Sequence, residues 1–438
     1  MIRRPCALAL IWLAAVARPM VAGPLPAGDP AAEGFVPAKL DPIQRMIADA
    51  VARKKVAGVA TLVARHGKVV HAGTAGLADV EVGRPLERST LFRIASMTKP
   101  ITSAAVMILV DDGAIRLDDP VSKYLPEFAA PTVLVLGPSA GGAPPPATVV
   151  RAERPITIHH LLTHSSGLSY RFLNPPVLGP YYVEAGVSDG LAETPGTIGD
   201  NVRRLARLPL IHQPGAAFTY SLSTDVLGRV VEVASGRDLD AFLRERLFAP
   251  LKMDDTSFLV PTAKRDRLAA VYMPLAPEGG FFRAPEPPVQ IGGLVFSATF
   301  PKWDTGHYFS GGAGLTSTID DYARFLQMVL DKGELDGVRV LKAATVETMT
   351  TDRMPGMAAG IPDHGDGFGY GFGVVRPENR YKDPAGPGSI SWAGFFHTSF
   401  WADPKTGTIG IFMSQLAPGG NTGIAAELKR LTYEAMAR

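Results

Sequence analysis

Strand-like sequence at both ends of the chain, with helical sequence between them, most constrains the fold. Near the start, residues 59–64 and 68–72 are typical of two strands, and His66-Gly67 predicts the turn of a hairpin. Near the end, residues 391–402 and 408–414 predict strands on either side of a turn at 403–407. Amphipathic helices are predicted from Asp41 and from Ile424. The pattern predicts one sheet built from both termini and flanked by helices, with a helical insertion.

A serine and a lysine three residues apart stand where a buried helix should begin. Ser96-Met97-Thr98-Lys99 precedes residues 101–110, which are apolar nearly all round. Residues at i and i+3 share a helical face, so Lys99 can lie beside Ser96. A serine hydroxyl needs an adjacent base, and a lysine amine in a crowded, partly desolvated pocket can lose its proton and serve as one. The spacing also occurs by chance, so the surrounding sequence must support it.

Five segments occur in the order that they have in serine β-lactamases and penicillin-binding proteins. They are residues 91–95, which lead into Ser96, and residues 117–126, 156–168, 250–258 and 311–318. The chain thus resembles the serine β-lactamase/penicillin-binding-protein superfamily over nearly its whole length. It is most similar to the class C β-lactamase-like carboxylesterase branch, the family VIII esterases.

The resemblance implies an α/β fold of the β-lactamase/transpeptidase type, an α+β sandwich with an antiparallel sheet. It implies a single catalytic domain over residues 24–438. Within it, residues 30–95 and 340–438 would form the α/β part, and residues 96–339 the mainly helical part.

The resemblance also assigns roles to three residues. Ser96 would be the acyl-accepting nucleophile, with Lys99 and Tyr220 as its proton acceptors. A phenol near a lysine ammonium ionises more easily and can shuttle protons. β-Lactamases and peptidases usually carry asparagine two residues after this tyrosine, where this chain has Leu222, which cannot hydrogen-bond the amide of a β-lactam side chain.

The strand beside the nucleophile also departs from the lactamase pattern. A literal Lys405-Thr406-Gly407 follows Asp403-Pro404 and predicts an exposed turn instead. The equivalent strand position is Trp392-Ala393-Gly394, which resembles the Trp-x-Gly pattern of the esterase branch. We expect the backbone N–H groups of Ser96 and Phe395 to form the oxyanion hole. The predicted substrate-binding residues are Trp392, Gly394, Leu222 and Phe396.

Two other motifs are weaker. Gly137-Pro138-Ser139-Ala140-Gly141 matches G-x-S-x-G, but the glycine and prolines that follow exclude the helix that a nucleophile elbow requires. His160 and His164 are four residues apart without an acidic partner at the usual metal-binding spacing. We therefore predict no metal and no cofactor.

The first residues predict export. Arg3-Arg4, an apolar run over residues 7–16 and small residues at 21–23 are typical of a signal peptide spanning residues 1–23. Its removal would eliminate Cys6, the one cysteine of the sequence. The expected location is the periplasm or the medium.

These features together predict a serine carboxylesterase for a small-molecule ester, and the aromatic residues near Trp392 favour short acyl chains. A β-lactamase or D-amino-acid/DD-peptidase stays an alternative, as does a non-catalytic relative that binds peptidoglycan or a protein. The formal net charge of +2 gives no reason to expect nucleic acid, and no stable membrane span is predicted. The sequence leaves open the natural ester, enantiopreference, acyl transfer, the oligomeric state and the cleavage site.

Overall fold

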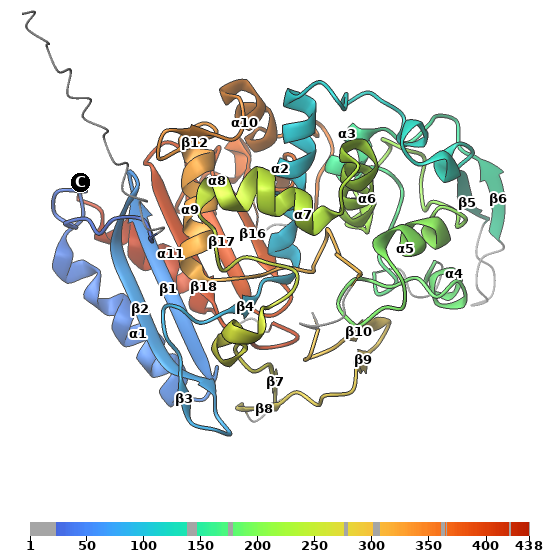
Figure 1. The fold of residues 1–438 in the computed structure, drawn as a ribbon. Coiled ribbons are helices and arrows are strands. Elements are labelled where there is room, and N and C mark those ends of the chain that lie inside the picture. Colours follow the sequence, from blue (N-terminus) through green and yellow to red (C-terminus); the bar gives the residue numbers. More distant parts are fainter. Residues whose placement is uncertain are drawn as a thin grey trace, which may run out of the picture.

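Both ends of the chain contribute strands to one eight-stranded sheet (Figure 1). The structure, a computed structural model, describes residues 23–137, 147–173, 178–275, 279–300, 307–360, 364, 366–419 and 422–437. All neighbouring strands run antiparallel. Their order across the sheet is β14 (Asp366–Phe368), β15 (Gly373–Val375), β16 (Ile390–Gly394), β17 (Thr398–Asp403), β18 (Thr408–Met413), β1 (Gly58–Arg65), β2 (Lys68–Asp79) and β3 (Arg84–Pro85). The predicted sheet built from both termini is confirmed.

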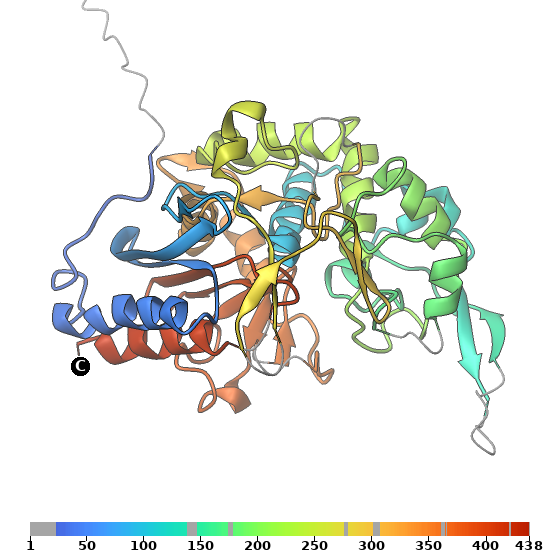
Figure 2. The same cartoon turned by 90° about the horizontal axis from the view of Figure 1, so that it is seen from below.

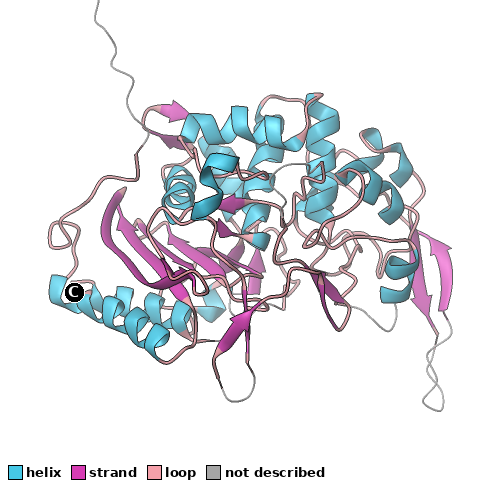
Figure 3. Cartoon of the chain, turned by 60° about the horizontal axis from the view of Figure 1, so that its bottom comes forward, coloured by secondary structure: helices cyan, strands magenta, loops and turns pink. Residues whose placement is uncertain are grey.

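Strand β1 lies in the middle of this sheet and is buried on both faces. Side chains alternate along a strand, so Val59 and Val63 face one side and Leu62 faces the other. The first side is covered by α1 (Asp41–Ala52) and α11 (Ile424–Ala435), which lie side by side in Figures 2 and 3. The second side is covered by α9 (Ile319–Leu330). The sheet is therefore sandwiched between helices, as predicted.

Most of the helices lie between β3 and β14. Helix α2 (Thr98–Asp111) is buried along almost its whole length and packs against α6 (Ser223–Ser235), so it forms the centre of this part. The other helices here, besides α9, are α3 (Ile158–Leu162), α4 (Gly179–Glu184), α5 (Ile198–Leu205), α7 (Leu239–Leu243), α8 (Ala249–Leu251) and α10 (Ala343–Thr350). Among the described residues, no helix combines the length and the apolar character needed to cross a bilayer.

Short strand pairs and single helical turns join these helices. The pairs are β4 (Phe92–Arg93) with β11 (Thr316–Ser317), β5 (Thr132–Leu136) with β6 (Ala147–Arg151), β7 (Tyr272–Pro274) with β8 (Phe281–Arg283), β9 (Val289–Ile291) with β10 (Leu294–Phe296), and β12 (Glu334–Leu335) with β13 (Val338–Arg339). The 3-10 turns are η1 (Pro37–Lys39), η2 (Ala95–Met97), η3 (Val121–Lys123), η4 (Pro126–Phe128), η6 (Thr262–Arg267) and η8 (Pro377–Asn379), and η5 (Arg244–Phe248) is a π turn.

One stretch differs from the sequence expectation. Residues 391–402 form two strands, β16 and β17, which are joined by a turn at residues 395–397. This turn contains two phenylalanines and a histidine rather than glycine or proline, and His397 adopts a positive φ of 67°. A turn without the usual turn residues leaves no break in the strand-like pattern, so the sequence does not show it.

Candidate active site

Two polar side chains, one from the same helical segment and one from a distant loop, meet at the oxygen of Ser96. Lys99 Nζ donates a hydrogen bond of 3.1 Å to Ser96 Oγ, and Tyr220 Oη donates one of 2.8 Å to the same atom. Lys99 Nζ also donates to the carbonyl of Gly312 at 2.9 Å. Lys99 is 1% exposed, whereas Ser96 is only partly buried. The structure thus brings together the predicted nucleophile and both predicted proton acceptors, of which Lys99 is buried and Tyr220, like Ser96, is partly buried.

A strained turn presents Ser96 at the start of α2. The chain leaves β4, passes through η2 and enters α2 within a few residues, and Ala95 adopts a φ of 41°. This left-handed conformation costs a residue with a side chain about 1–2 kcal/mol. Ser96 therefore lies in the first turn of helical structure, where backbone N–H groups lack helical partners and favour negative charge.

Two tyrosine rings enclose the amine of Lys99. Its Nζ lies 4.6 Å from the ring centre of Tyr220 and 5.3 Å from that of Tyr170, within the range of cation–π attraction. Burial, followed by the neighbouring Tyr220 and Asp225, raises the pKa of Tyr170 well above its usual range. Tyr170 therefore stays a neutral phenol, and Tyr220 is the one that contacts Ser96. The sequence signal for Tyr170 is its place directly after the segment 156–168.

Buried hydrogen bonds hold the loop that carries Tyr220. The carbonyl of His164 accepts from the N–H of Thr219 at 2.8 Å, and Nδ1 of His164 accepts from the N–H of Ser221 at 3.3 Å. Burial and the charge of Lys99 lower the pKa of His164 well below its usual range, so the ring is neutral and can accept. The hydroxyl of Ser221 also contacts that of Ser223 at 2.8 Å. His164 is thus a structural support for Tyr220.

The other histidine of the predicted pair is also engaged in the fold. Nδ1 of His160 accepts the N–H of Thr157 and completes the cap of α3. Within the described ranges, no group of three or more His, Cys, Asp or Glu residues could hold a metal ion. The rival nucleophile Ser139 lies outside the described residues.

Strand β16 passes directly beside the turn that carries Ser96. A Cβ at Gly394 would lie 2.2 Å from the carbonyl oxygen of Ile94 and 2.4 Å from Thr398 Oγ1, so only glycine fits there. Two residues earlier, the ring of Trp392 lies 5.5 Å from that of Tyr220. Phe395 begins the turn after Gly394, and its N–H stays, with that of Ser96, the predicted oxyanion donor.

Trp392 also belongs to a wider aromatic group. Its ring lies 5.3 Å from that of Phe368 and 4.8 Å from that of His364, and Phe368 lies 5.4 Å from Phe218. Phe218, Phe368 and His364 were not singled out from the sequence, because they come from three different segments. Together with Tyr220 and Trp392 they form a group of aromatic rings beside Ser96, in which Phe368 and Trp392 are buried.

Three residues predicted to bind substrate are enclosed by protein. Leu222 is fully buried at the start of α6, and Trp392 is 5% exposed. Phe396 is 1% exposed and packs against Phe395 with 5.3 Å between ring centres. Their contact with a substrate stays a prediction. Lys405 is exposed in the turn between β17 and β18, which confirms that the literal Lys-Thr-Gly is not the strand beside Ser96.

Comparison with known proteins agrees with this geometry. The family model described as Beta-lactamase matches residues 43–434. The chain belongs to the Beta-lactamase family. It is 36% identical over 398 residues to Protein Rv1367c of Mycobacterium tuberculosis, which covers 88% of this chain and 92% of that protein. It is 34% identical over 380 residues to Esterase EstB of Burkholderia gladioli, which covers 85% of this chain and 90% of the esterase.

A solved structure shows the same architecture. EstCE1, described as a hydrolase with promiscuous acyltransferase activity, superposes with a TM-score of 0.76 and 28% identity over 91% of this chain and 99% of its own. The resemblance predicted from the sequence motifs is thus confirmed.

Two buried carboxylates near the site of this Beta-lactamase family member escaped sequence reasoning. Asp225 lies on α6, five residues after Tyr220, and is 1% exposed. Burial raises the pKa of Asp225 to about 6 and that of Asp189 to about 7. Helix α6 also carries Arg229 and Glu232, and an aspartate in the first turn of a helix is common, so the sequence did not distinguish Asp225. No partner residue could be assigned to it from the chain order.

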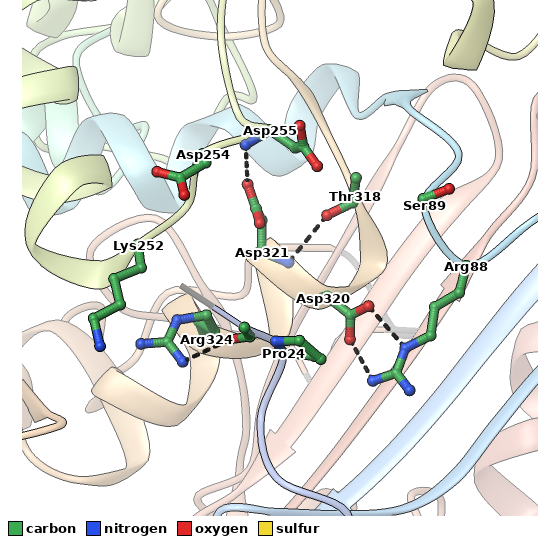
Figure 4. Close-up of a pocket in the computed structure, with 11 residues that line it drawn as sticks. Pro24, Arg88, Ser89, Lys252, Asp254, Asp255, Thr318, Asp320, Asp321 and Arg324 are labelled. Atoms are coloured by element: carbon green, nitrogen blue, oxygen red, sulfur yellow. Dashed lines mark hydrogen bonds and ion pairs between the residues drawn. The ribbon is translucent and has the colours of Figure 1, made fainter. Parts of the chain in front are cut away.

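A separate charged pocket of about 340 Å³ lies beside the start of α9 (Figure 4). There Asp320 forms an ion pair with Arg88, and Asp321 Oδ2 accepts the N–H of Asp255 at 2.8 Å. Neither Ser96 nor the residues that contact it line this pocket. Its carboxylates Asp320 and Asp321 are held by donors of the protein itself and lie outside the cluster around Ser96.

Proposed function

We propose that this serine carboxylesterase of the β-lactamase fold hydrolyses short-chain carboxylic esters through an acyl-enzyme formed on Ser96. One observation carries the proposal: Ser96 Oγ is contacted by both Lys99 Nζ at 3.1 Å and Tyr220 Oη at 2.8 Å. A hydroxyl between two proton-transferring groups is the arrangement that nucleophilic catalysis by serine requires. The similarity to Esterase EstB and to the hydrolase EstCE1 supports ester chemistry.

The reaction proceeds in two halves. Ser96 Oγ bonds to the ester carbonyl carbon while its proton passes to the Lys99–Tyr220 pair, and the carbonyl electrons move onto oxygen. The N–H groups of Ser96 and Phe395 stabilise that oxyanion. When the bond to the alcohol breaks, Tyr220 returns the proton to the leaving oxygen. Water then attacks the carbonyl carbon of the acyl group on Ser96, and the Lys99–Tyr220 pair accepts a proton from that water. As the bond to Ser96 Oγ breaks and the acid leaves, the same proton passes to Ser96 Oγ.

Two side chains favour a simple ester over a β-lactam or a peptide. Leu222 stands where related lactamases carry an amide, and Trp392 stands where they carry a lysine that binds carboxylate. Without these polar groups, the site has no hydrogen-bonding side chain that would be left unpaired when the substrate lacks an amide or a carboxylate. Simple esters are therefore accepted. The preference for short acyl chains is supported by the aromatic group around Trp392 and Phe368, which packs against Tyr220 beside Ser96.

Hydrolysis of p-nitrophenyl butyrate and of a chromogenic cephalosporin, compared side by side, tests the proposal. We expect the ester to react and the cephalosporin to react far more slowly. Ser96→Ala should lose at least about 10³-fold in kcat, and Ser139→Ala serves as the control that keeps activity. A faster cephalosporin reaction favours the lactamase or peptidase alternative. If neither substrate is turned over, the binding-protein alternative is favoured. If Ser139→Ala abolishes activity and Ser96→Ala does not, the nucleophile is Ser139 rather than Ser96.

We also propose that the chain is exported to the periplasm or the medium. The proposal is supported by the signal-peptide pattern of residues 1–23. Expression of the full chain followed by N-terminal sequencing of the periplasmic and secreted fractions tests it. A mature N-terminus near residue 23 is expected, and an active protein that retains Met1 in the cytoplasm contradicts it.

A further inference from the structure

A buried carboxylate that the proposed reaction does not use lies behind Lys99. Asp225 is 1% exposed, and its Oδ1 accepts a hydrogen bond of 2.8 Å from the hydroxyl of Ser310. Its other oxygen, Oδ2, accepts no hydrogen bond of ordinary geometry from the described residues. A buried carboxylate oxygen without such a donor is costly, so its retention calls for a physical reason.

Asp225 Oδ2 and the amine of Lys99 both lie close to Gly312. A Cβ placed on Gly312 would lie 2.5 Å from Asp225 Oδ2 and 3.5 Å from Lys99 Nζ. These two distances limit the separation of the charged atoms to about 6 Å. The hydrogen bonds of Lys99 Nζ in the described structure go instead to Ser96 Oγ and to the carbonyl of Gly312. Asp225 is therefore a neighbouring charge of Lys99 rather than its hydrogen-bond partner.

Asp225 also holds the backbone that binds Lys99. The Ser310 hydroxyl that donates to Asp225 accepts the N–H of Ala313 at 3.0 Å, which closes the turn over residues 310–313. Within this turn, the carbonyl of Gly312 accepts from Lys99 Nζ at 2.9 Å. One side chain thus supports the lysine both through its charge and through the position of a carbonyl.

Another carboxylate, Asp189, also lies near this pair. Burial raises the pKa of Asp189 to about 7, and its carboxylate lies 3.8 Å from Arg171 Nε. The pKa of Asp225 is raised to about 6 by burial, while Ser310, Lys99 and the Gly312 backbone oppose that rise. The remaining titratable groups that face Asp225 or Lys99 are Tyr170, Tyr220, Tyr308 and His164.

We propose that Asp225 is a positioning residue for the site: its buried negative charge, together with the turn that it holds at Gly312, orients the amine of Lys99 toward Ser96 Oγ. The proposal rests on the acyl-enzyme mechanism at Ser96. Because Asp225 acts through its charge as well as through the turn, removal of that charge should shift the pH dependence of the reaction.

The pH dependence of kcat/KM for p-nitrophenyl butyrate between pH 5 and 9.5 tests this role, because it reports ionisations of the free enzyme. Asp225→Asn keeps the shape of the side chain and removes its charge. Two unit charges about 6 Å apart at an effective dielectric constant near 20 interact enough to move an ionisation by up to about 2 pH units. We expect the midpoint of the acid limb to move by about 1–2 units to lower pH.

Two further variants separate charge from structure. Asp321→Asn is the matched control, because Asp321 is also a buried aspartate with a pKa raised to about 6 but lies in the pocket of Figure 4. Its midpoint should stay within about 0.3 pH units of the wild type. Ser310→Ala removes a donor that stabilises the charge of Asp225, so its midpoint should move in the same direction by a smaller amount.

Coincident midpoints for the wild type, folded Asp225→Asn and Asp321→Asn overturn the proposal. If Asp225→Asn does not fold, an unmoved midpoint in folded Ser310→Ala overturns it instead. If Ser96→Ala keeps its activity, the proposed acyl-enzyme mechanism at Ser96 is itself wrong, and this outcome is distinct from a failure of the Asp225 proposal. Full loss in Ser96→Ala together with unmoved midpoints refutes only the role of Asp225.

Discussion

Replacing Gly394 by alanine tests whether β16 positions the oxyanion hole. The new Cβ would lie 2.2 Å from the Ile94 carbonyl oxygen, whereas ordinary contacts are about 3.5 Å, so the strand and the turn must separate by about 1 Å. Because that oxygen belongs to the backbone just before Ser96, the displacement changes the spacing between Ser96 and Phe395. A misplacement of this size costs about 10²-fold in rate, and the crowding costs about 1–3 kcal/mol in unfolding free energy.

Steady-state kinetics with p-nitrophenyl butyrate and thermal unfolding measure the two effects. We expect kcat to fall about 10²-fold while the variant stays folded at the assay temperature. Ala393→Ser is the matched control, since its side chain lies on the opposite face of the same strand and should leave kcat within about twofold. A Gly394→Ala enzyme with wild-type kcat, or an Ala393→Ser enzyme that is equally impaired, would refute this role of the strand.

Three other perturbations have defined outcomes. Tyr220→Phe keeps the ring but removes the hydroxyl 2.8 Å from Ser96 Oγ, so kcat/KM should fall about 10²–10⁴-fold in a nitrophenyl ester assay, and an unchanged value would exclude proton transfer by this phenol. Lys405→Ala alters an exposed turn and should leave kcat/KM within about twofold, whereas a large loss would place the literal Lys-Thr-Gly in the site. Burial raises the pKa of Asp321 from 3.8 to about 6, so the folded protein binds this proton more tightly and loses stability as the pH rises through that interval. Urea unfolding of Asp321→Asn should therefore show a gain over the wild type that grows by up to about 3 kcal/mol from pH 4 to pH 7, and a constant difference would contradict it.

Local spacing explains why part of the site could be predicted. Ser96 and Lys99 are three residues apart at a helix start, so a single helical turn brings them together whatever the rest of the chain does. The turn residues around Lys405 likewise showed that this lysine is not on the strand beside Ser96. Tyr220 and Trp392 were assigned from the order of motifs. Their contact, with 5.5 Å between ring centres, depends on the fold.

Other features could not be predicted because no local signal marks them. The turn at residues 395–397 lacks glycine and proline, so the sequence reads as one strand where the structure has two. Leu222 and Phe396 have apolar side chains that suit either a substrate pocket or the core, and both are buried. Whether an apolar side chain packs in the core or borders a substrate pocket depends on its neighbours in the folded protein.

The sequence alone determined the order of the elements and the pairing of Ser96 with Lys99, and it predicted that Leu222 and Trp392 stand where lactamases carry polar residues. These are properties of residue identity and of short spacings, which survive without knowledge of distant contacts. Only the tertiary structure decided that Gly394 touches Ile94 and that Asp225 lies within about 6 Å of Lys99 across Gly312. Residues more than a hundred positions apart meet there, and close packing and electrostatic coupling depend on distances in space that a local pattern does not contain.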